Sequence, residues 1–271
     1  MPDSPADSPN LRVGMLYCKT DTKHVIGSPL EAIVGSLSVE PAPDIILAPE
    51  WFFVPEHNFY TPRQYAALRT RLKRATEDID SLVIPGTIAR LDSQGRYLNT
   101  ALVLCGGKTL LEYSKRRDGG DSNFAYSHQR EWQDGKKKGV FRWQDYACGL
   151  EICADHGTLK GDKEASDLDF HFVVSCGMYF YDDSLCISEN GLALLCDGCS
   201  SGNVIQHSQD SRNRRQSDRP DRTYPLTDDL KLYVYEVPRP GAEPIKASGA
   251  KSGSFASRLS SAWAHLTGGD S

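Results

Sequence analysis

The sequence predicts an α/β fold, on three observations. Short apolar runs bounded by glycine, proline or polar residues recur along the chain, for example at 11–18 and 81–88, and such runs are typical of buried strands. Between them, residues 62–79 have the apolar spacing of an amphipathic helix, with arginines and lysines on the solvated face. The length of 271 residues is enough for one large domain, and no change of composition in the middle marks a boundary.

Capping and turn residues set the limits of these elements. One helix begins after Ser28, a capping residue, with Pro29 in its first turn. Pro49 ends an early strand, and Gly106 with Gly107 joins two later strands as a hairpin. The predicted helices are 28–34 and 62–79, and the predicted strands are 11–18, 44–48, 81–88, 97–105, 109–114, 140–143, 146–152, 170–176, 192–196 and 230–237.

The remaining segments are polar. Residues 1–10 are predicted to be a disordered lead, and 208–222 a mobile loop whose aspartates dilute its positive charge and disfavour nucleic-acid contact. We therefore expect a single domain over 11–238, followed by a tail at 239–271. The tail contains a short amphipathic helix, expected to dock on its own domain or on a partner subunit because its opposite face is not basic. Its apolar face carries Phe255, Leu259, Trp263 and Leu266.

Composition and charge exclude several classes of protein. Hydrophobic residues make up 39% and charged residues 25% of the chain, and the mean hydropathy is -0.46, all ordinary for a soluble globular protein. A net charge of -5 gives no reason to expect nucleic acid or an anionic membrane as the main partner. No apolar run reaches the roughly 18 residues of a spanning helix, and the start does not read as a secretory signal. We expect a cytoplasmic protein that binds neither nucleic acid nor membrane.

The eight cysteines are expected to be reduced. Most lie in apolar runs such as 173–176, and a chain of this length does not need disulfides for stability. Cys196 and Cys199 have the spacing of a zinc-binding pair, but no second pair of ligands lies at a suitable distance along the chain. The sequence therefore predicts no metal site.

Three reactive side chains stand where apolar strands end. These are Glu50, Lys115 and Cys153, the last within the stretch Gly-Leu-Glu-Ile-Cys-Ala-Asp-His-Gly at 149–157. Strand ends at one edge of an α/β sheet converge on a common crevice. There a carboxylate could take the proton of a thiol, and an ammonium could stabilise the oxyanion that forms when the thiolate attacks a carbonyl or nitrile carbon. Taken singly, each charge is more simply a solvated strand-end residue.

Five motifs in succession resemble those of the nitrilase (carbon-nitrogen hydrolase) superfamily. They occur in the right order, and the resemblance covers about residues 11–200, although it does not assign a branch. The motifs are Pro49-Glu50, Pro85-Gly86-Thr87, Tyr97-Leu98-Asn99-Thr100-Ala101, Tyr113-Ser114-Lys115 and Gly149-Leu150-Glu151-Ile152-Cys153-Ala154-Asp155.

The resemblance implies an αββα sandwich that pairs through its helices as an αββα-αββα homodimer, or a higher homo-oligomer. It implies a triad of Glu50 as general base, Lys115 as oxyanion stabiliser and Cys153 as nucleophile, helped by the backbone N–H of Ala154. A second glutamate often lies between the lysine and the cysteine, and Glu131 is the best match. No metal or organic cofactor is implied.

The substrate side of this site is less well defined. Trp51, Asp155 and Tyr179 are expected to contact the substrate, with core packing the equal alternative for the aromatic residues. His156 follows Cys153 by three residues and is interpreted as a pocket residue rather than its base. The segment after Asp155 lacks the Arg-Phe-Pro-Glu continuation often seen in the family, so the substrate is not identified. An anionic substrate group could meet Arg116, Arg117 or His128.

The function predicted from this resemblance is hydrolysis of a non-peptide C–N bond in a small amide through a thioester intermediate. An amide is favoured over a nitrile because the amide-cleaving branches are the more numerous. Three alternatives stay open: acyl transfer from the same intermediate to an amine, a true nitrilase, and a non-catalytic member that keeps the fold as a binding module.

Overall fold

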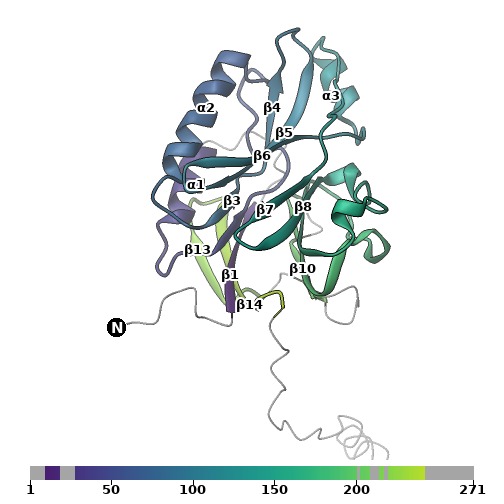
Figure 1. Cartoon of the computed structure of the whole chain (residues 1–271). Coiled ribbons are helices and arrows are strands. Elements are labelled where there is room, and N and C mark those ends of the chain that lie inside the picture. The colour runs from purple at the N-terminus through teal and green to yellow at the C-terminus, as the bar shows by residue number, and fades with distance from the viewer. Residues whose placement is uncertain (1–9, 19–27, 200–201, 208–213, 217–218, 242–271) are drawn as a thin grey trace, which may run out of the picture.

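The computed structural model describes residues 10–18, 28–199, 202–207, 214–216 and 219–241, which form two β-sheets packed against each other (Figure 1). The first sheet has the order β13-β14-β1-β2-β3-β5-β4, with β6 paired to β5. Strands β1, β2 and β3 are parallel, as expected for strands joined through helices. The bounds are β1 Asn10–Cys18, β2 Ile45–Leu47, β3 Leu82–Ile84, β4 Thr87–Leu91, β5 Tyr97–Cys105, β6 Lys108–Ser114, β13 Arg222–Pro225 and β14 Leu230–Pro238.

The second sheet has the order β12-β11-β10-β9-β8-β7, and its central strands β8, β9 and β10 are parallel. Side chains alternate across these strands, so that Leu150 and Ile152 of β8 face the first sheet while Glu151 points to the outer face. The bounds are β7 Val140–Trp143, β8 Tyr146–Ile152, β9 Leu168–Ser175, β10 Ile187–Asp197, β11 Val204–His207 and β12 Arg214–Gln216.

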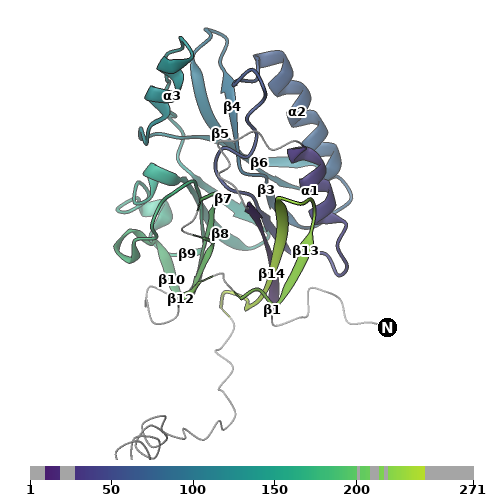
Figure 2. The ribbon, with the colours of Figure 1, turned by 180° about the vertical axis from the view of Figure 1, so that it is seen from behind.

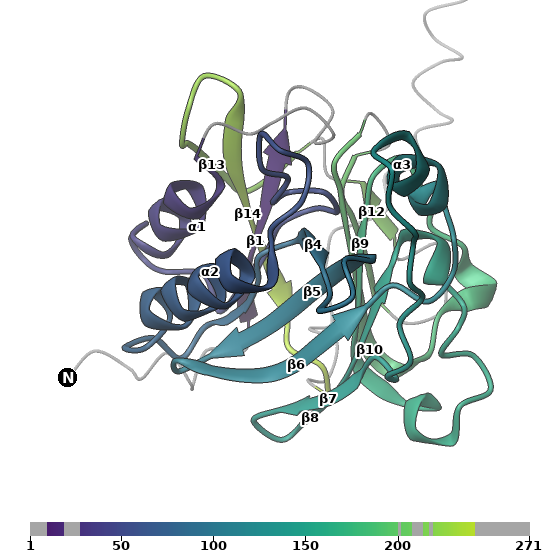
Figure 3. The ribbon, with the colours of Figure 1, turned by 90° about the horizontal axis from the view of Figure 1, so that it is seen from above.

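Two helices cover the outer face of the first sheet. Figure 3 shows α1 (Pro29–Leu37) and α2 (Pro62–Ala75) side by side on this face, and Figure 2 shows α1 next to β13 and β14. Leu68 and Leu72 of α2 pack with Ile33 of α1 on buried residues of the sheet. The start of α2 is fixed by a capping box, in which Thr61 and Gln64 exchange hydrogen bonds.

The outer face of the second sheet is covered differently. In the part of the chain that the structure describes, no α-helix lies on it; the turns at 153–167 and 176–186 do, with three short 3-10 segments. Met178 and Phe180 from the second of these turns pack on Val173 and Leu195 of the sheet. The two-sheet α/β sandwich is as predicted, but among the described residues turns rather than α-helices cover the outer face of the second sheet.

The predicted elements agree in type with the observed ones except at four places. The strand β11 (Val204–His207) was not predicted. The segment 116–138 was predicted as a loop, but it contains the helix α3 (Asp121–Ser127). The run 81–88 is divided between β3 and β4, because Gly86 takes a left-handed φ of 79° that interrupts the strand. Within the predicted loop 208–222, residues 214–216 form β12 and Arg222 begins β13.

Some predictions lie outside the described residues. These are most of the N-terminal lead (1–9), the loop segments 208–213 and 217–218, and the tail helix with its apolar face, since description ends at residue 241. Among the described helices, none is both long and apolar enough to cross a membrane.

Candidate active site

The ends of β2, β6 and β8 bring Glu50, Lys115 and Cys153 together, as the sequence predicted. The ammonium Nζ of Lys115 lies 2.7 Å from Oε1 of Glu50, and both side chains are only 1% exposed. The half-buried Cys153 thiol lies close enough to Glu50 for the carboxylate charge to raise the thiol pKa. Three residues that are far apart in sequence therefore form one contiguous cluster.

The turn that presents Glu50 depends on the Pro85-Gly86-Thr87 segment. A side chain at Gly86 would meet the carbonyl oxygen of Pro49 at 2.2 Å, so only glycine fits there. Thr87 Oγ1 accepts a hydrogen bond from the backbone N–H of Trp51, which has a left-handed φ of 62°. The Glu50 N–H donates to the carbonyl oxygen of Ser175 in the second sheet, 3.2 Å away. The base is thus anchored to both sheets.

Lys115 lies between two buried carboxylates. Its Nζ is 2.7 Å from Oδ2 of Asp121 as well as 2.7 Å from Glu50. Burial alone would lower the pKa of Lys115, but the charges of Glu50 and Asp121 outweigh it and hold that pKa above its ordinary value. Lys115 is therefore a permanent cation of this cluster.

Asn99 joins the two carboxylates. Its Nδ2 donates to Oε1 of Glu50 at 2.8 Å and to Oδ1 of Asp121 at 3.0 Å. Because both partners are acceptors, the amide nitrogen must face them. Tyr97 donates its hydroxyl to the same Asp121 oxygen at 3.1 Å. The Tyr-x-Asn motif of β5 thus orients both acids around Lys115.

Cys153 begins a 3-10 turn (Cys153–Asp155) directly after β8, with a left-handed φ of 46°. Burial and the neighbouring Glu50 charge raise the pKa of its thiol to about 12, although Lys115 and the backbone N–H of Cys176 oppose them. At neutral pH the resting cysteine is therefore a thiol, which needs a base to become a nucleophile.

Glu50 has the pKa of a base that works near neutral pH. Burial and the Asp121 charge raise the pKa of Glu50 to about 7, against the opposing effect of Lys115. A carboxylate with this pKa can accept a proton in one step and return it in the next. The cluster thus holds a thiol, a base next to it and a fixed cation.

Comparison with solved structures identifies the architecture. An amidase from Nesterenkonia sp. superposes with a TM-score of 0.58 at 14% identity, over 94% of this chain and 97% of that one. Nit3 of Saccharomyces cerevisiae, of branch 10 of the nitrilase superfamily, gives 0.56 at 14% identity, over 86% and 92%. A carbon-nitrogen hydrolase from Helicobacter pylori gives 0.53 at 11% identity, over 84% and 89%. The chain has the nitrilase fold. No protein-family model matches the sequence, and no curated protein does either.

Within this nitrilase fold, Asp121 and not Glu131 is the second acid at the lysine. The Glu131 side chain is exposed, and its backbone carbonyl accepts a hydrogen bond from the Tyr97 N–H at 2.7 Å. The structure therefore does not bring Glu131 into the cluster. Asp121 stands at the start of α3, just after Gly119 and Gly120, and this Gly-Gly-Asp start of a short helix is the sequence signal that the prediction missed.

The residues expected to contact the substrate have different surroundings. Trp51 is buried next to Glu50, with its ring centroid 4.6 Å from that of Phe124 and 6.0 Å from that of Tyr97. Tyr179 is 74% exposed. Half-buried Ala154 directly follows Cys153. Of these three, Trp51 is the one that belongs to the aromatic cluster beside the buried acids.

Asp155 and His156 face partners within the protein. Asp155 is fully buried and accepts hydrogen bonds from the Tyr113 hydroxyl at 2.7 Å and from the backbone N–H groups of Arg116 and Arg117. It thereby links the turn of the cysteine to the chain just after Lys115. His156 donates toward Glu151 and packs on Phe180.

The charged groups suggested for an anionic substrate lie apart from the buried cluster. The side chains of Arg116 and Arg117 are exposed. His128 packs its ring against Phe124 and Phe59, with centroids 4.7 and 5.7 Å apart. His128 is therefore part of the aromatic packing around α3.

Gly119 lies where the loop after Lys115 crosses the site. A Cβ there would be 2.9 Å from Cβ of Ala154 and 3.1 Å from Nζ of Lys115. We expect Gly119→Ala to displace Lys115 and lower kcat by roughly 10- to 100-fold, because small misplacements of catalytic groups are costly. Gly35→Ala in α1, where the nearest atom would be at an ordinary 3.4 Å, is the control. Equal turnover of both variants in steady-state assays would contradict the expectation.

Proposed function

We propose that this protein is a cysteine-dependent hydrolase that cleaves the C–N bond of small amides. The observation that carries the proposal is the cluster in which the Cys153 thiol lies beside Glu50 and Lys115, which are ion-paired with each other and buried. The nitrilase fold, shared with an amidase and with a carbon-nitrogen hydrolase, supports it. In this proposal Glu50, Lys115 and Cys153 are the catalytic residues, and no cofactor takes part.

The first half of the reaction forms a thioester. As the sulfur of Cys153 attacks the amide carbon, Glu50 takes the thiol proton, and the carbonyl oxygen becomes an oxyanion. Two donors of the Lys115 ammonium face Glu50 and Asp121, so the third can donate to this oxyanion, together with the backbone N–H of Ala154. When the tetrahedral intermediate collapses, Glu50 passes its proton to the leaving amine or ammonia.

The second half releases the acid. Glu50, again a carboxylate, takes a proton from water as the water oxygen attacks the thioester carbon. Collapse of this intermediate breaks the C–S bond, the sulfur regains the proton from Glu50, and a carboxylic acid leaves. Each cycle thus consumes one water and restores the thiol.

Asp121 has the role in this proposal that the sequence suggested for Glu131. A lysine that must stabilise an oxyanion has to stay charged in a buried site, and two carboxylates around one ammonium keep it so. Asn99 positions both carboxylates through one amide nitrogen. We therefore assign Asp121 as the residue that holds Lys115 charged and in place.

A short aliphatic amide is the substrate class that we favour. The residue next to Glu50 is Trp51, a buried apolar ring packed on Phe124, and it adds no charge beside the cluster. The Nesterenkonia amidase has been solved with butyramide, and one of its mutants carries an acrylamide adduct at the active-site cysteine. Both are small uncharged amides.

The test uses butyramide as substrate and acrylamide as a covalent probe. We expect wild-type protein to release ammonia from butyramide and to gain one acrylamide, mapped to Cys153 by peptide mass spectrometry. Cys153→Ala should lose both signals, and turnover by that variant at the wild-type rate would contradict the proposal. Product analysis in the presence of a competing amine tests for an acyltransferase, which would pass the butyryl group to the amine in preference to water, and butyronitrile in place of butyramide tests for a nitrilase. A binding module would turn over neither compound and would have a Cys153 thiol no more reactive than free cysteine.

Assembly and location belong to the same proposal. We favour a homodimer in the cytoplasm, as the fold resemblance implies. Since turns replace helices on the outer face of the second sheet, any pairing there would use the turns at 153–167 and 176–186.

A further inference from the structure

We propose that Glu151, held by His156 and His171, is a positioning residue that fixes the turn carrying Cys153. This inference rests on the proposed function, because it concerns how the proposed nucleophile is placed. Glu151 is fully buried at the end of β8, two residues before Cys153, on the outer face of the second sheet. It takes no part in the reaction steps described above.

The carboxylate of Glu151 ties down the chain on the far side of Cys153. Its Oε2 accepts a hydrogen bond from the Gly157 N–H at 2.9 Å, and its Oε1 accepts from the Leu159 N–H at 2.8 Å. The Thr158 hydroxyl donates to Oε1 at 3.0 Å. The strand before the cysteine and the turn after it are therefore bound to the same group.

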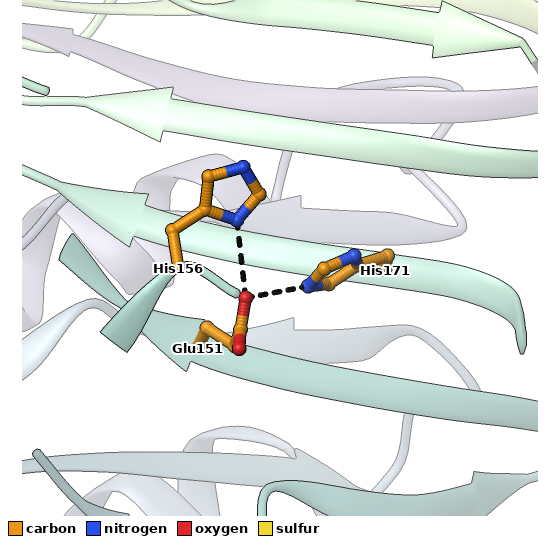
Figure 4. A group of neighbouring side chains, drawn as sticks. All are labelled: Glu151, His156 and His171. Carbon is orange, nitrogen blue, oxygen red and sulfur yellow. Dashed lines mark hydrogen bonds and ion pairs between the residues drawn. The ribbon is translucent and has the colours of Figure 1, made fainter. Parts of the chain in front are cut away.

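Two histidines complete this set of donors (Figure 4). Nδ1 of His156, from the turn, and Nε2 of His171, from β9, each lie 3.0 Å from Oε2 of Glu151. Burial disfavours the charged carboxylate, but the hydrogen bonds from His156 and His171 outweigh it, and the pKa of Glu151 lies well below its ordinary value. Glu151 is therefore an ionised carboxylate with five donors around it.

The same histidines reach the second covering turn. Nε2 of His156 lies against the peptide of Tyr181, and its ring stacks on Phe180 with centroids 5.3 Å apart. Nδ1 of His171 accepts from the Cys186 N–H at 3.4 Å. Through these contacts, one carboxylate connects β8, β9 and both turns that cover this face of the sheet.

Cys153 needs such support because of its backbone. A φ of 46° is unfavourable for a residue with a side chain and persists only where the surroundings impose it. In the described part of the chain, no α-helix packs over this face to supply the constraint. The Glu151 network supplies it with hydrogen bonds.

A metal ion is the competing explanation, since the three ligand atoms lie within 4.8 Å of one another. The geometry at His171 disfavours it. If Nε2 of His171 bound a metal, the proton would move to Nδ1, which would then face the N–H of Cys186 donor to donor. Each oxygen of Glu151 also accepts a backbone N–H, and Oε1 accepts the Thr158 hydroxyl as well. A hydrogen-bond network without an ion fits these contacts better.

The test measures how fast iodoacetamide alkylates Cys153, resolved by peptide mass spectrometry and divided by the rate at Cys105, a half-buried thiol on another strand. In Glu151→Gln an amide N–H₂ would face backbone donors, so the turn should loosen. We expect this ratio to rise about tenfold, well below the melting temperature, because a loosened turn frees the thiol from the burial and the Glu50 charge that hold its pKa high. His171→Leu should raise it similarly, whereas His171→Gln, which keeps a donor, should raise it less. If Glu151→Gln does not fold, the two His171 variants test the positioning role of Glu151 by themselves.

The control is Leu72→Ala, which removes a buried side chain from α2 on the other sheet, in a cluster that includes neither Cys153 nor the Glu151 network. It should lower the melting temperature and leave the ratio unchanged. Unchanged ratios in folded Glu151→Gln and His171→Leu would overturn the proposal. So would a stoichiometric metal in the wild-type protein, by elemental analysis, that His171→Leu loses. Because the readout is a ratio of alkylation rates, it decides the positioning role even if butyramide is not hydrolysed.

Discussion

Lys115→Met is expected to abolish turnover of a small amide and to destabilise the protein by about 3–5 kcal/mol, the cost of breaking a buried ion pair by removing one partner. The reason is that Glu50 and Asp121 would face each other without the cation that lies 2.7 Å from each. Met has nearly the shape of Lys, so packing changes little. Urea unfolding monitored by circular dichroism measures the loss of stability.

Two further variants separate charge from packing. Lys138→Met removes a lysine whose ion pairs with Asp162 and Glu164 are exposed to solvent, and it should leave stability nearly unchanged. Adding Asp121→Asn to Lys115→Met removes one of the two orphaned charges and should restore part of the stability but none of the activity. A Lys115→Met protein as stable as the wild type would show that the buried acids do not depend on Lys115.

The positions of the three central site residues followed from local signals. Glu50, Lys115 and Cys153 each come directly after an apolar run, and the structure ends β2, β6 and β8 just before them. β2 and β6 belong to one sheet and β8 to the sheet packed against it, so the local signals placed each residue at a strand end, whereas the family resemblance was needed to bring the three ends together. The pairing of β5 with β6 aligns Asn99 with Lys115, because the Lys115 N–H donates to the carbonyl oxygen of Asn99 at 2.8 Å. The lysine that follows this hairpin therefore lies next to Asn99.

The second acid could not be chosen in the same way, because its position depends on packing between distant segments. The short helix α3 puts Phe124 against Trp51 and Phe59, and this packing brings Asp121 to Lys115. Both Trp51 and Phe59 are far from α3 in the sequence. Glu131 is closer to the position that the family pattern suggests, but the residue pairs with β5 through its backbone and its side chain is left outside.

The role of Glu151 was even harder to predict from the sequence than that of Asp121. In the sequence it is an acid inside an apolar strand, with nothing nearby to indicate a role. Its meaning depends on His171, twenty positions later, which the parallel pairing of β8 and β9 brings to the same sheet face. A buried carboxylate needs partners of this kind, and only the sheet register identifies them.

The pH dependence of the wild-type enzyme is expected to reflect Glu50. Glu50 must be ionised to take the thiol proton, and burial raises its pKa to about 7, so kcat/KM should rise with pH through about 7. Deprotonation of Lys115 should not lower kcat/KM at the pH where a lysine ordinarily loses its proton, since the two carboxylates hold the pKa of Lys115 above that range. The profile is measured with butyramide over the pH range in which the protein stays folded. A flat profile between pH 5 and pH 9 would exclude Glu50 as the titrating base.

Glu50→Gln is expected to lower kcat/KM by about 10²–10⁴-fold and to remove the rise of kcat/KM near pH 7, because the amide cannot accept the proton.

The same substitution should change the stability of the protein in a way that depends on pH. In the folded protein Glu50 has a pKa of about 7 instead of its ordinary 4.5, so the folded state binds its proton more tightly, and stability is lost as the pH rises through about 7. Gln lacks this titration, so the melting temperature of the variant relative to wild type should increase from pH 5 to pH 8. Glu112→Gln, which changes a half-buried carboxylate paired with Arg69 and Arg90, should alter neither the profile nor that trend. If Glu50→Gln instead lost stability progressively with rising pH, the assignment of a raised pKa to Glu50 would be wrong.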